Sequence, residues 1–364
     1  MKRLAAVLSF ALFAAACGDS SPATPSPSGS ADAGSDGSTV GLAGLRADWR
    51  QMAAQYMEGR ADNWLTSPPK VSNIGCAMSC HTTYPYTLAR HALTGDIATP
   101  KAALARQRFE GRVAEGVGAT PFYGSNADAK TKESLATEAL LNATALSLDD
   151  VWSKRPLSPA STAALDLMWT TQNAEGTWAW LEFNLEPWET RNDYGAAMAV
   201  LLLGSIPENT TANQAAGTTK LLGYLRGRLA TMALHDRATL LWTSGYLKDS
   251  ITKDQRAAIA TEVAGKQLED GGFSAGGWGK GSRAAQVAGT SDGYATALAT
   301  LALCHETGHE AAVQKGLQWL AQSQAEDGSW PGQSVNTTSS RAKTFMTDAA
   351  TAYAVLALTQ CGKQ

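Results

Sequence analysis

The residues with the most distinctive chemistry are two cysteines and a histidine in the segment Cys76-Ala-Met-Ser-Cys80-His81. Two cysteines followed directly by a histidine are typical of haem c attachment, because the thiols add to the haem vinyl groups and the histidine binds the iron. The common motif has two residues between the cysteines, and this segment has three. A short cysteine pair can also form a disulfide or bind zinc. We therefore expect covalent haem c on Cys76, Cys80 and His81, with a Cys76–Cys80 disulfide as the main alternative.

The sequence does not choose a second axial ligand for the iron. His305 and His309 are four residues apart near a predicted helix end, but Gly308 interrupts the helix, which favours surface positions. Methionines at plausible core positions are also candidates, although core packing is the favoured role for each of them. The other residues considered are His91, His235, Met57, Met168 and Met198.

The N-terminus predicts export. Lys2 and Arg3 precede a short apolar run that ends in Ala14-Ala15-Ala16-Cys17, as in a secretory signal peptide over residues 1–16. Alanines directly before Cys17 resemble the lipobox of bacterial lipoproteins, in which the cysteine is acylated and becomes the mature N-terminus. Gly18, and not Asp, directly follows Cys17, which in that family favours the outer membrane over the inner one. We expect a lipid anchor at Cys17 and a location on the outer membrane facing the periplasm, with simple cleavage after Ala16 as the alternative.

The elements that must position this chemistry are helices in a repeat. Each of three segments has a Gln, a Gly four residues later and an aromatic residue two further on. Each segment ends one predicted helix and precedes a second, Ala-rich helix, and its glycine suits the left-handed turn between them. The longer interval between the first two segments predicts another unit near residues 220–247. The segments are Gln172–Trp178, Gln267–Phe273 and Gln324–Trp330.

Helix pairs joined by Gln-x-x-x-Gly-x-Trp turns resemble the repeats of squalene–hopene cyclases and of the related prenyltransferase and terpenoid-cyclase toroids. The resemblance covers residues 131–364 and implies an all-α fold, a closed α/α toroid around a central cavity. An open helical solenoid is the alternative.

The chemistry of those enzymes is not complete in this chain. The sequence contains no Asp-x-Asp-Asp motif, which hopene-type cyclases use to protonate an alkene. Its adjacent pair Asp149-Asp150 falls in a predicted loop. Tyr294 stands where prenyltransferases would have a zinc-binding cysteine, so zinc would lack a thiolate. Ordinary cyclase or prenyltransferase activity is therefore not the leading prediction.

A second resemblance concerns two longer segments. Residues 80–90, which read Cys-His-Thr-Thr-Tyr-Pro-Tyr-Thr-Leu-Ala-Arg, resemble a segment of exported bacterial proteins that combine a haem-c-like motif with squalene-cyclase-like repeats. Residues 180–189, leading to Asp193-Tyr194-Gly195-Ala196, resemble another segment of the same group. The resemblance implies architecture and cofactor, but no substrate.

Acidic and aromatic residues are expected at one mouth of the toroid, where they would form a pocket for a small organic ligand. Aspartates that start helices can equally be caps. The candidates are Glu182, Glu186, Trp188, Glu189, Asp193, Tyr194, Asp292 and Asp348.

The net charge of −3 with scattered Lys and Arg predicts no nucleic-acid binding. We expect a signal peptide over 1–16, a lipidated and disordered linker over 17–40, a helical haem-c-like segment over 41–130 and the repeat domain over 131–364. Cys304 and Cys361 lie on two similar predicted helices, where they could pair or stay buried.

Three functions follow from these patterns. The first is a membrane-anchored haem c redox protein that binds an apolar or carbohydrate-like molecule and has an electron-transfer partner. The second is a non-enzymatic binding toroid, and the third is a divergent terpenoid-cyclase-like enzyme.

Overall fold

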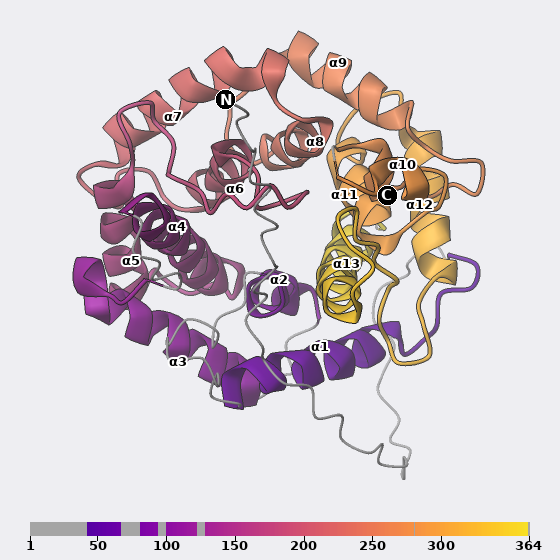
Figure 1. The fold of residues 1–364 in the computed structure, drawn as a ribbon, viewed down its shortest axis with the longest axis horizontal. Helices are drawn as coiled ribbons and strands as arrows, with labels where there is room; N and C mark the ends of the chain where they lie inside the picture. Colours follow the sequence, from indigo (N-terminus) through magenta and orange to yellow (C-terminus); the bar gives the residue numbers. More distant parts are fainter. Residues whose placement is uncertain (1–41, 67–80, 94–99, 122–127, 280, 363–364) are drawn as a thin grey trace, which may run out of the picture.

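The computed structural model describes residues 42–66, 81–93, 100–121, 128–279 and 281–362. These residues form helices and two isolated β-bridges, without a β-strand. The helices form a ring with an outer and an inner layer (Figure 1). The all-α toroid predicted from the sequence is therefore confirmed.

The two layers alternate along the chain, so that each outer helix is followed by an inner one (Figure 1). The outer helices are α1 (Trp49–Thr66), α3 (Pro100–Glu115), α5 (Pro159–Thr171), α7 (Gln214–Arg228), α9 (Lys253–Ala264) and α12 (Glu310–Gln322). The inner helices are α2 (Thr83–Ala89), α4 (Asp128–Trp152), α6 (Asn192–Ser205), α8 (Leu234–Thr243), α11 (Gly293–Leu303) and α13 (Ser340–Gln360). A short helix, α10 (Ala284–Val287), lies between α9 and α11.

Inner helices differ from outer helices in burial. Every residue of α11 is buried, whereas α9 buries only three of its side chains, those of Ile259, Ala260 and Val263. A helix that is apolar on all sides needs neighbours on all sides, while one with a single apolar stripe can cover a surface. This difference in composition is why the Ala-rich helices lie inside.

The glutamine turns lock neighbouring repeats together. In each turn the Gln Nε2 donates to the carbonyl of its own turn glycine and to a backbone carbonyl of the next outer helix. Those second acceptors are Gly217 in α7, Ala312 in α12 and Trp49 in α1. The three turn glycines have φ of +95°, +86° and +87°, as the left-handed turn requires.

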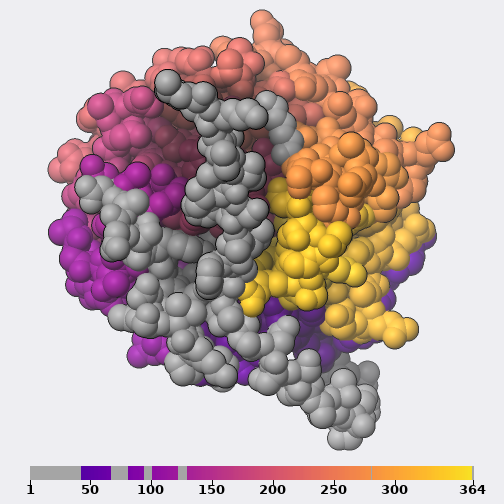
Figure 2. Space-filling model, viewed as in Figure 1, coloured from indigo at the N-terminus to yellow at the C-terminus, as the bar shows by residue number. Residues whose placement is uncertain are grey.

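The last of these contacts closes the ring. Gln324 donates to the Trp49 carbonyl at 3.0 Å, and the rings of Trp49 and Trp330 meet edge to face at 6.3 Å. In Figure 2 the indigo atoms of the N-terminal helices accordingly lie against the yellow atoms of the last repeat. A closed toroid, and not an open solenoid, is the outcome.

Three expectations about the elements change. The region 41–130 contributes α1, α2 and α3 to the ring, although the resemblance began at residue 131. The pair Asp149-Asp150 lies in the last turn of α4, not in a loop. Helix α13 starts at Ser340, capped by Ser339, so Asp348 is inside the helix and cannot cap it.

Further features of the helices in the described ranges bear on the ring. Ser158 caps α5 by accepting from the Ser161 amide, with Pro159 at the first helical position. The unit without a signature is the pair α7 and α8, joined by a short 3-10 turn over Leu229–Thr231. Cys304 and Cys361 form a disulfide between α11 and α13. None of the helices in the described ranges is both long and apolar enough to cross a bilayer.

Candidate functional site

The centre of the ring is occupied by aromatic side chains from different inner helices. Tyr194 of α6, His235 of α8, Tyr294 of α11 and Tyr353 of α13 are all buried. Neighbouring rings have centroids 5.0 to 5.8 Å apart, as in the pairs Tyr294–Tyr353, Tyr194–His235 and His235–Tyr294. Such contacts are the usual edge or offset geometry of packed aromatic rings. The described part of the ring is therefore packed through its centre.

A chain of hydrogen bonds runs through this cluster. The Tyr294 hydroxyl is 2.7 Å from His235 Nε2, and His235 Nδ1 is 2.9 Å from Asp236 Oδ1. Trp188 Nε1 donates to the same hydroxyl at 2.8 Å. Because an indole N–H can only donate, Tyr294 accepts from Trp188 and keeps its own proton for His235 Nε2. His235 Nδ1–H then donates to Asp236, and every polar group has a partner.

Burial shapes the acid–base properties of this chain. Desolvation raises the pKa of Tyr294 well above its ordinary value, and nearby Tyr353 raises it further. Desolvation also raises the pKa of Asp236, while the hydrogen bond from His235 opposes that rise. His235 thus lies between a phenol that burial keeps neutral and a carboxyl whose pKa is raised by burial and lowered by the hydrogen bond from His235.

A small cavity lies against this chain. Its walls include Tyr294, His235, Glu186, Trp278 and Val335, and its volume is about 10 Å³, room for about one water molecule. The indole nitrogen of Trp278 is buried without a hydrogen-bond partner. Ligand sites for drug-sized molecules are about 300–1,000 Å³, so the loops that carry Glu186, Trp278 and Val335 must separate before such a molecule can enter.

The loop over residues 182–190 is held in place by backbone bonds. Leu185 and Glu189 exchange two backbone hydrogen bonds, and Trp180 Nε1 donates to the Trp188 carbonyl at 2.7 Å. The peptide bond between Glu186 and Pro187 is cis. The hydrogen bonds of this loop hold Trp188 in the position from which its Nε1 donates to the Tyr294 hydroxyl.

His81 packs against Trp188, beside this loop. Its ring is stacked on Phe345 with centroids 5.0 Å apart and meets Trp188 at 5.4 Å. Its Nε2 is 3.5 Å from Glu189 Oε1. The fold therefore joins two segments that the sequence analysis singled out separately, 80–90 and 180–189. Cys76 and Cys80 lie outside the described residues, and so does Cys17.

Other members of the 80–90 segment contact the ring. Thr82 donates to Asp348, Tyr86 donates to Glu58 of α1, and Arg90 pairs with Asp149 of α4. These polar side chains of the segment pack α2 between its neighbours. Packing therefore accounts for them without reference to a cofactor.

Two of the predicted site carboxylates hold repeats together. Asp193 accepts from Tyr224 at 2.6 Å and from Arg228 at 3.0 Å, both on α7. Asp348 accepts in the same way from Tyr56 and Arg60, which have the same spacing on α1. Tyr and Arg four residues apart present both donors on one face of a helix. Asp193 and Asp348 are thus buried carboxylates that each join an inner helix to an outer helix through a hydrogen bond and an ion pair.

Asp292 is the N-cap of α11, which was the alternative to a pocket role in the sequence-based prediction. Its oxygens accept from the amides of Ala295 and Ala275 at 3.0 and 2.7 Å, and it is fully buried. Desolvation raises the pKa of this carboxyl to about 6, against the lowering effect of its hydrogen bonds. Its side chain therefore joins the start of α11 to the 3-10 turn at Ala275 and stabilises the fold.

The remaining predicted residues lie in different places: on the cavity wall, in the aromatic cluster, in the core or on the surface. Glu186 lines the cavity, Tyr194 lies in the aromatic cluster, and Glu182 is exposed. Met57, Met168 and Met198 are buried in the core, and His305 is exposed. Within the described ranges no three His, Cys, Asp or Glu side chains are grouped so that they could hold a metal ion.

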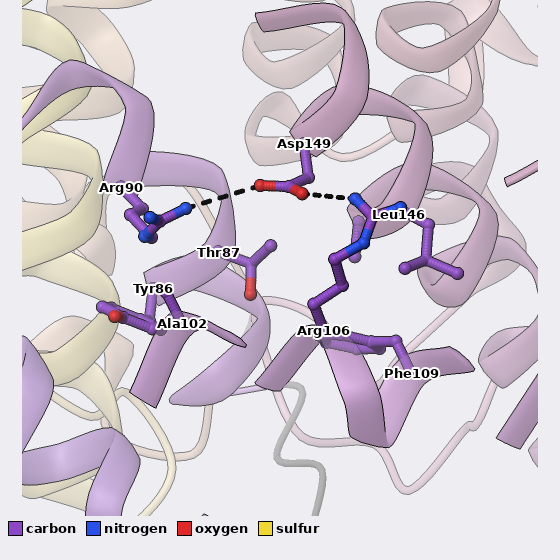
Figure 3. Close-up of a pocket in the computed structure, with 9 residues that line it drawn as sticks. Tyr86, Thr87, Arg90, Ala102, Arg106, Phe109, Leu146 and Asp149 are labelled. Carbon is purple, nitrogen blue, oxygen red and sulfur yellow. Dashed lines mark hydrogen bonds and ion pairs between the residues drawn. The ribbon is translucent and has the colours of Figure 1, made fainter. Parts of the chain in front are cut away.

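A second small cavity lies between α2, α3 and α4 (Figure 3). Figure 3 shows Asp149 between Arg90 and Arg106, which pair with it. Arg155 and His91 also contact Asp149. Hydrogen bonds from His91 and Arg106 hold the pKa of that carboxyl far below its usual range, against the effect of burial. This cluster is an ion-pair network that joins η2 (Arg90–Ala92), α3 and the end of α4.

The sequence analysis missed Asp236 and gave His235 only as a possible iron ligand. One feature of the sequence could have indicated this pair. His235-Asp236 occurs at the start of the inner helix in the repeat unit that has no Gln-Gly turn, where α6 and α11 each carry an aspartate. Adjacent residues on a helix do not usually face each other, so the pairing of these two side chains was not foreseeable from spacing.

No protein-family model matches the chain, and no curated protein matches it. Solved structures do match. A protein from Actinoplanes is 13% identical with a TM-score of 0.54 and covers 87% of this chain and 99% of its own. The apo form of MstE, a type II terpene cyclase from Scytonema, is 14% identical with a TM-score of 0.56 and covers 86% and 98%. A variant of MstE in complex with geranylgeranyl dihydroxybenzoate has a TM-score of 0.52 at 14% identity, covering 86% and 99%. At this identity the likeness shows a terpenoid-cyclase-like fold.

Proposed function

We propose that the protein is a divergent terpenoid-cyclase-like enzyme that performs acid–base chemistry on an apolar organic molecule. The observation that carries this proposal is the chain Trp188–Tyr294–His235–Asp236 against the small cavity at the mouth. The likeness to a type II terpene cyclase supports an isoprenoid-like ligand. The proposal favours this third function over the redox function that the sequence alone placed first.

The chain of hydrogen bonds suits proton transfer to and from the ligand. Tyr294 can take a proton from the ligand as its own proton moves to His235 Nε2, and the imidazolium that forms is stabilised by Asp236. The reverse transfer delivers a proton to the ligand. In each direction two coupled proton transfers, one at each side of the Tyr294 oxygen, move one net proton between the ligand and His235, as general acid–base catalysis requires.

The same chemistry argues against protonation of an isolated alkene. A neutral phenol whose pKa is raised by burial is a weak acid, and the sequence lacks the Asp-x-Asp-Asp motif. Removal of a proton beside a cationic or carbonyl carbon, or proton delivery to an oxygen atom, fits the chain better.

The test is turnover of an isoprenoid by the purified protein. Geranylgeranyl dihydroxybenzoate, the substrate in the MstE complex, is the first probe, with polyprenyl epoxides and ketones next. We expect a new product by mass spectrometry, and a rate about 10²-fold or more lower for His235→Gln and for Asp236→Asn. His305→Gln is the matched control because it makes the same change at an exposed histidine.

Two results would oppose the proposal. Product formation by His235→Gln at the wild-type rate would remove the acid–base role. Ligand binding, followed by tryptophan fluorescence, without any product would favour the alternative of a non-enzymatic binding toroid.

We propose haem c as a second candidate, on the observation that the partly exposed His81 packs against Trp188. Cys76 and Cys80 would hold the haem and His81 would bind its iron. Because His81 Nε2 is 3.5 Å from Glu189, iron binding would have to replace that contact. An absorption spectrum of protein made with a cytochrome c maturation system tests this, and colourless protein with a Cys76–Cys80 disulfide would reject it.

Export and anchoring remain proposals of the same kind. We propose that Cys17 is lipidated and holds the chain on the outer membrane, facing the periplasm. Mass spectrometry of the N-terminal peptide after expression in a bacterial host tests this. A mature chain that starts at Cys17 without a lipid would reject it.

A further inference from the structure

A continuous row of aromatic rings extends from the mouth through the centre of the toroid. The centroid distances are 5.4 Å from His81 to Trp188, 5.0 Å from Trp188 to Tyr294 and 5.0 Å from Tyr294 to Tyr353. A further step of 5.8 Å leads from Tyr353 to Trp242 in α8. Rings in such contact favour electron transfer between neighbours over a single long step.

Tyr294 is the member of this row that has a base on its hydroxyl. A phenol that loses an electron becomes a very strong acid, so its oxidation is easy only where the proton can leave at the same time. His235 Nε2, at 2.7 Å, can take that proton. The Tyr353 hydroxyl instead lies 3.2 Å from the hydroxyl of Tyr194, which is not a base.

The surroundings of His235 favour the product of this step. Once protonated, the imidazolium is 2.9 Å from Asp236 Oδ1, and both residues are 2% exposed. A buried ion pair with hydrogen bonds avoids the cost of an isolated charge. Trp188 Nε1 continues to donate to the Tyr294 oxygen in either state.

We propose that Tyr294 is a redox-active tyrosine. It gives one electron, through Trp188, to a one-electron oxidant of the metal-complex class in solution that reaches the partly exposed His81 end of the row, while its phenolic proton moves to His235 Nε2. The products are a neutral tyrosyl radical, a histidine imidazolium and the oxidant reduced by one electron. A one-electron reductant reverses the step, and the proton returns to the phenol.

This inference goes beyond the proposed acid–base function, since it needs neither the isoprenoid nor turnover. It also does not depend on haem, because any one-electron oxidant in solution that reaches the His81 end of the row would serve. The experiment can therefore use the protein without ligand, and its failure would leave the acid–base proposal intact.

The test is photochemical oxidation of the purified protein with a ruthenium tris-bipyridine complex and a sacrificial electron acceptor, followed by electron paramagnetic resonance. We expect a tyrosyl radical that shifts when the tyrosines are ring-deuterated and that is lost in Tyr294→Phe. His235→Gln should lose it as well, because an amide can accept the hydrogen bond but cannot take the proton. Trp188→Phe should slow its formation.

Tyr246→Phe is the matched control. Tyr246 is partly buried and its hydroxyl contacts an amide, Gln360, so the same substitution there should leave the signal unchanged. A wild-type signal in folded Tyr294→Phe or in folded His235→Gln would overturn the proposal. If Tyr294→Phe does not fold, 3,5-difluorotyrosine inserted at position 294 replaces it, and an unshifted radical spectrum would be equally decisive against the proposal.

Discussion

The glycine of the last turn offers the sharpest prediction about how the ring is held closed. Gly328 has φ +87°, and a Cβ built on it would lie 2.2 Å from the carbonyl oxygen of Met52 in α1. Gly308 has nearly the same φ, +86°, but a Cβ there would meet nothing within 4 Å. The two glycines therefore separate the cost of the left-handed conformation from the cost of displacing α1.

The magnitude follows from three contributions. An L-residue in the left-handed region costs about 1–2 kcal/mol, and this applies to both glycines. At Gly328 the Cβ must also push backbone of α1 away, which costs about 1–3 kcal/mol. The hydrogen bond from Gln324 to Trp49 then weakens, a loss of about 0.5–1.5 kcal/mol. We expect Gly328→Ala to destabilise the protein by about 3–6 kcal/mol and Gly308→Ala by about 1–2 kcal/mol.

The assay is equilibrium unfolding in urea, followed by tryptophan fluorescence and by far-ultraviolet circular dichroism. The two variants should differ by about 2–4 kcal/mol in the free energy of unfolding, with Gly328→Ala the less stable. Equal losses for the two variants would refute the argument, because they would mean that contact between the last turn and α1 does not contribute to closure.

Three further predictions concern buried groups. Burial raises the pKa of Asp292 to about 6, so the folded protein binds this proton more tightly than the unfolded chain does. The free energy of unfolding should therefore fall by about 3 kcal/mol as the pH rises from about 4 to 6. Urea titrations should show this fall in the wild type and its absence in Asp292→Asn. Tyr56→Phe removes the hydroxyl that donates to buried Asp348 and should cost about 1.5–3 kcal/mol in unfolding measurements, with no change in turnover; a loss of turnover in the folded variant would place Asp348 in the site after all. Replacing Cys304 and Cys361 with alanine opens a loop closed over 57 residues and should cost about 4 kcal/mol, whereas a midpoint of unfolding equal to that of the wild type would contradict this.

The repeats could be predicted because their signals are local. A helix followed by Gln-x-x-x-Gly-x-Trp specifies its own turn, since Gln172 bonds to the Gly176 carbonyl and Trp178 donates to the Met168 carbonyl of the helix before it. The Ala-rich composition of the second helices likewise predicted that they lie inside. The unit over α7 and α8 could be predicted only by its place in the series.

The candidate site was predicted in part, because aspartates at similar sequence positions have different partners in space. Asp193 and Asp348 were grouped with Asp292, yet the first two bind Tyr and Arg on the next outer helix and the third caps α11. Whether a carboxylate is a cap, a clamp or a proton carrier depends on the residues that the ring brings to it, and those lie up to 292 positions away, as Tyr56 does from Asp348.

The sequence by itself determined the all-α class, the helix pairs, the turn glycines and the segments 80–90 and 180–189. The class, the helix pairs and the turn glycines follow from periodicity, capping and backbone conformation, which act within a few residues, whereas the two segments were singled out by their resemblance to exported proteins. Only the tertiary structure decided that α1 meets the last repeat, that His81 lies beside Trp188, and that Tyr294 bonds to His235. Those contacts join inner helices and loops that are distant in sequence, and they form because closing the ring buries the Ala-rich helices on every side.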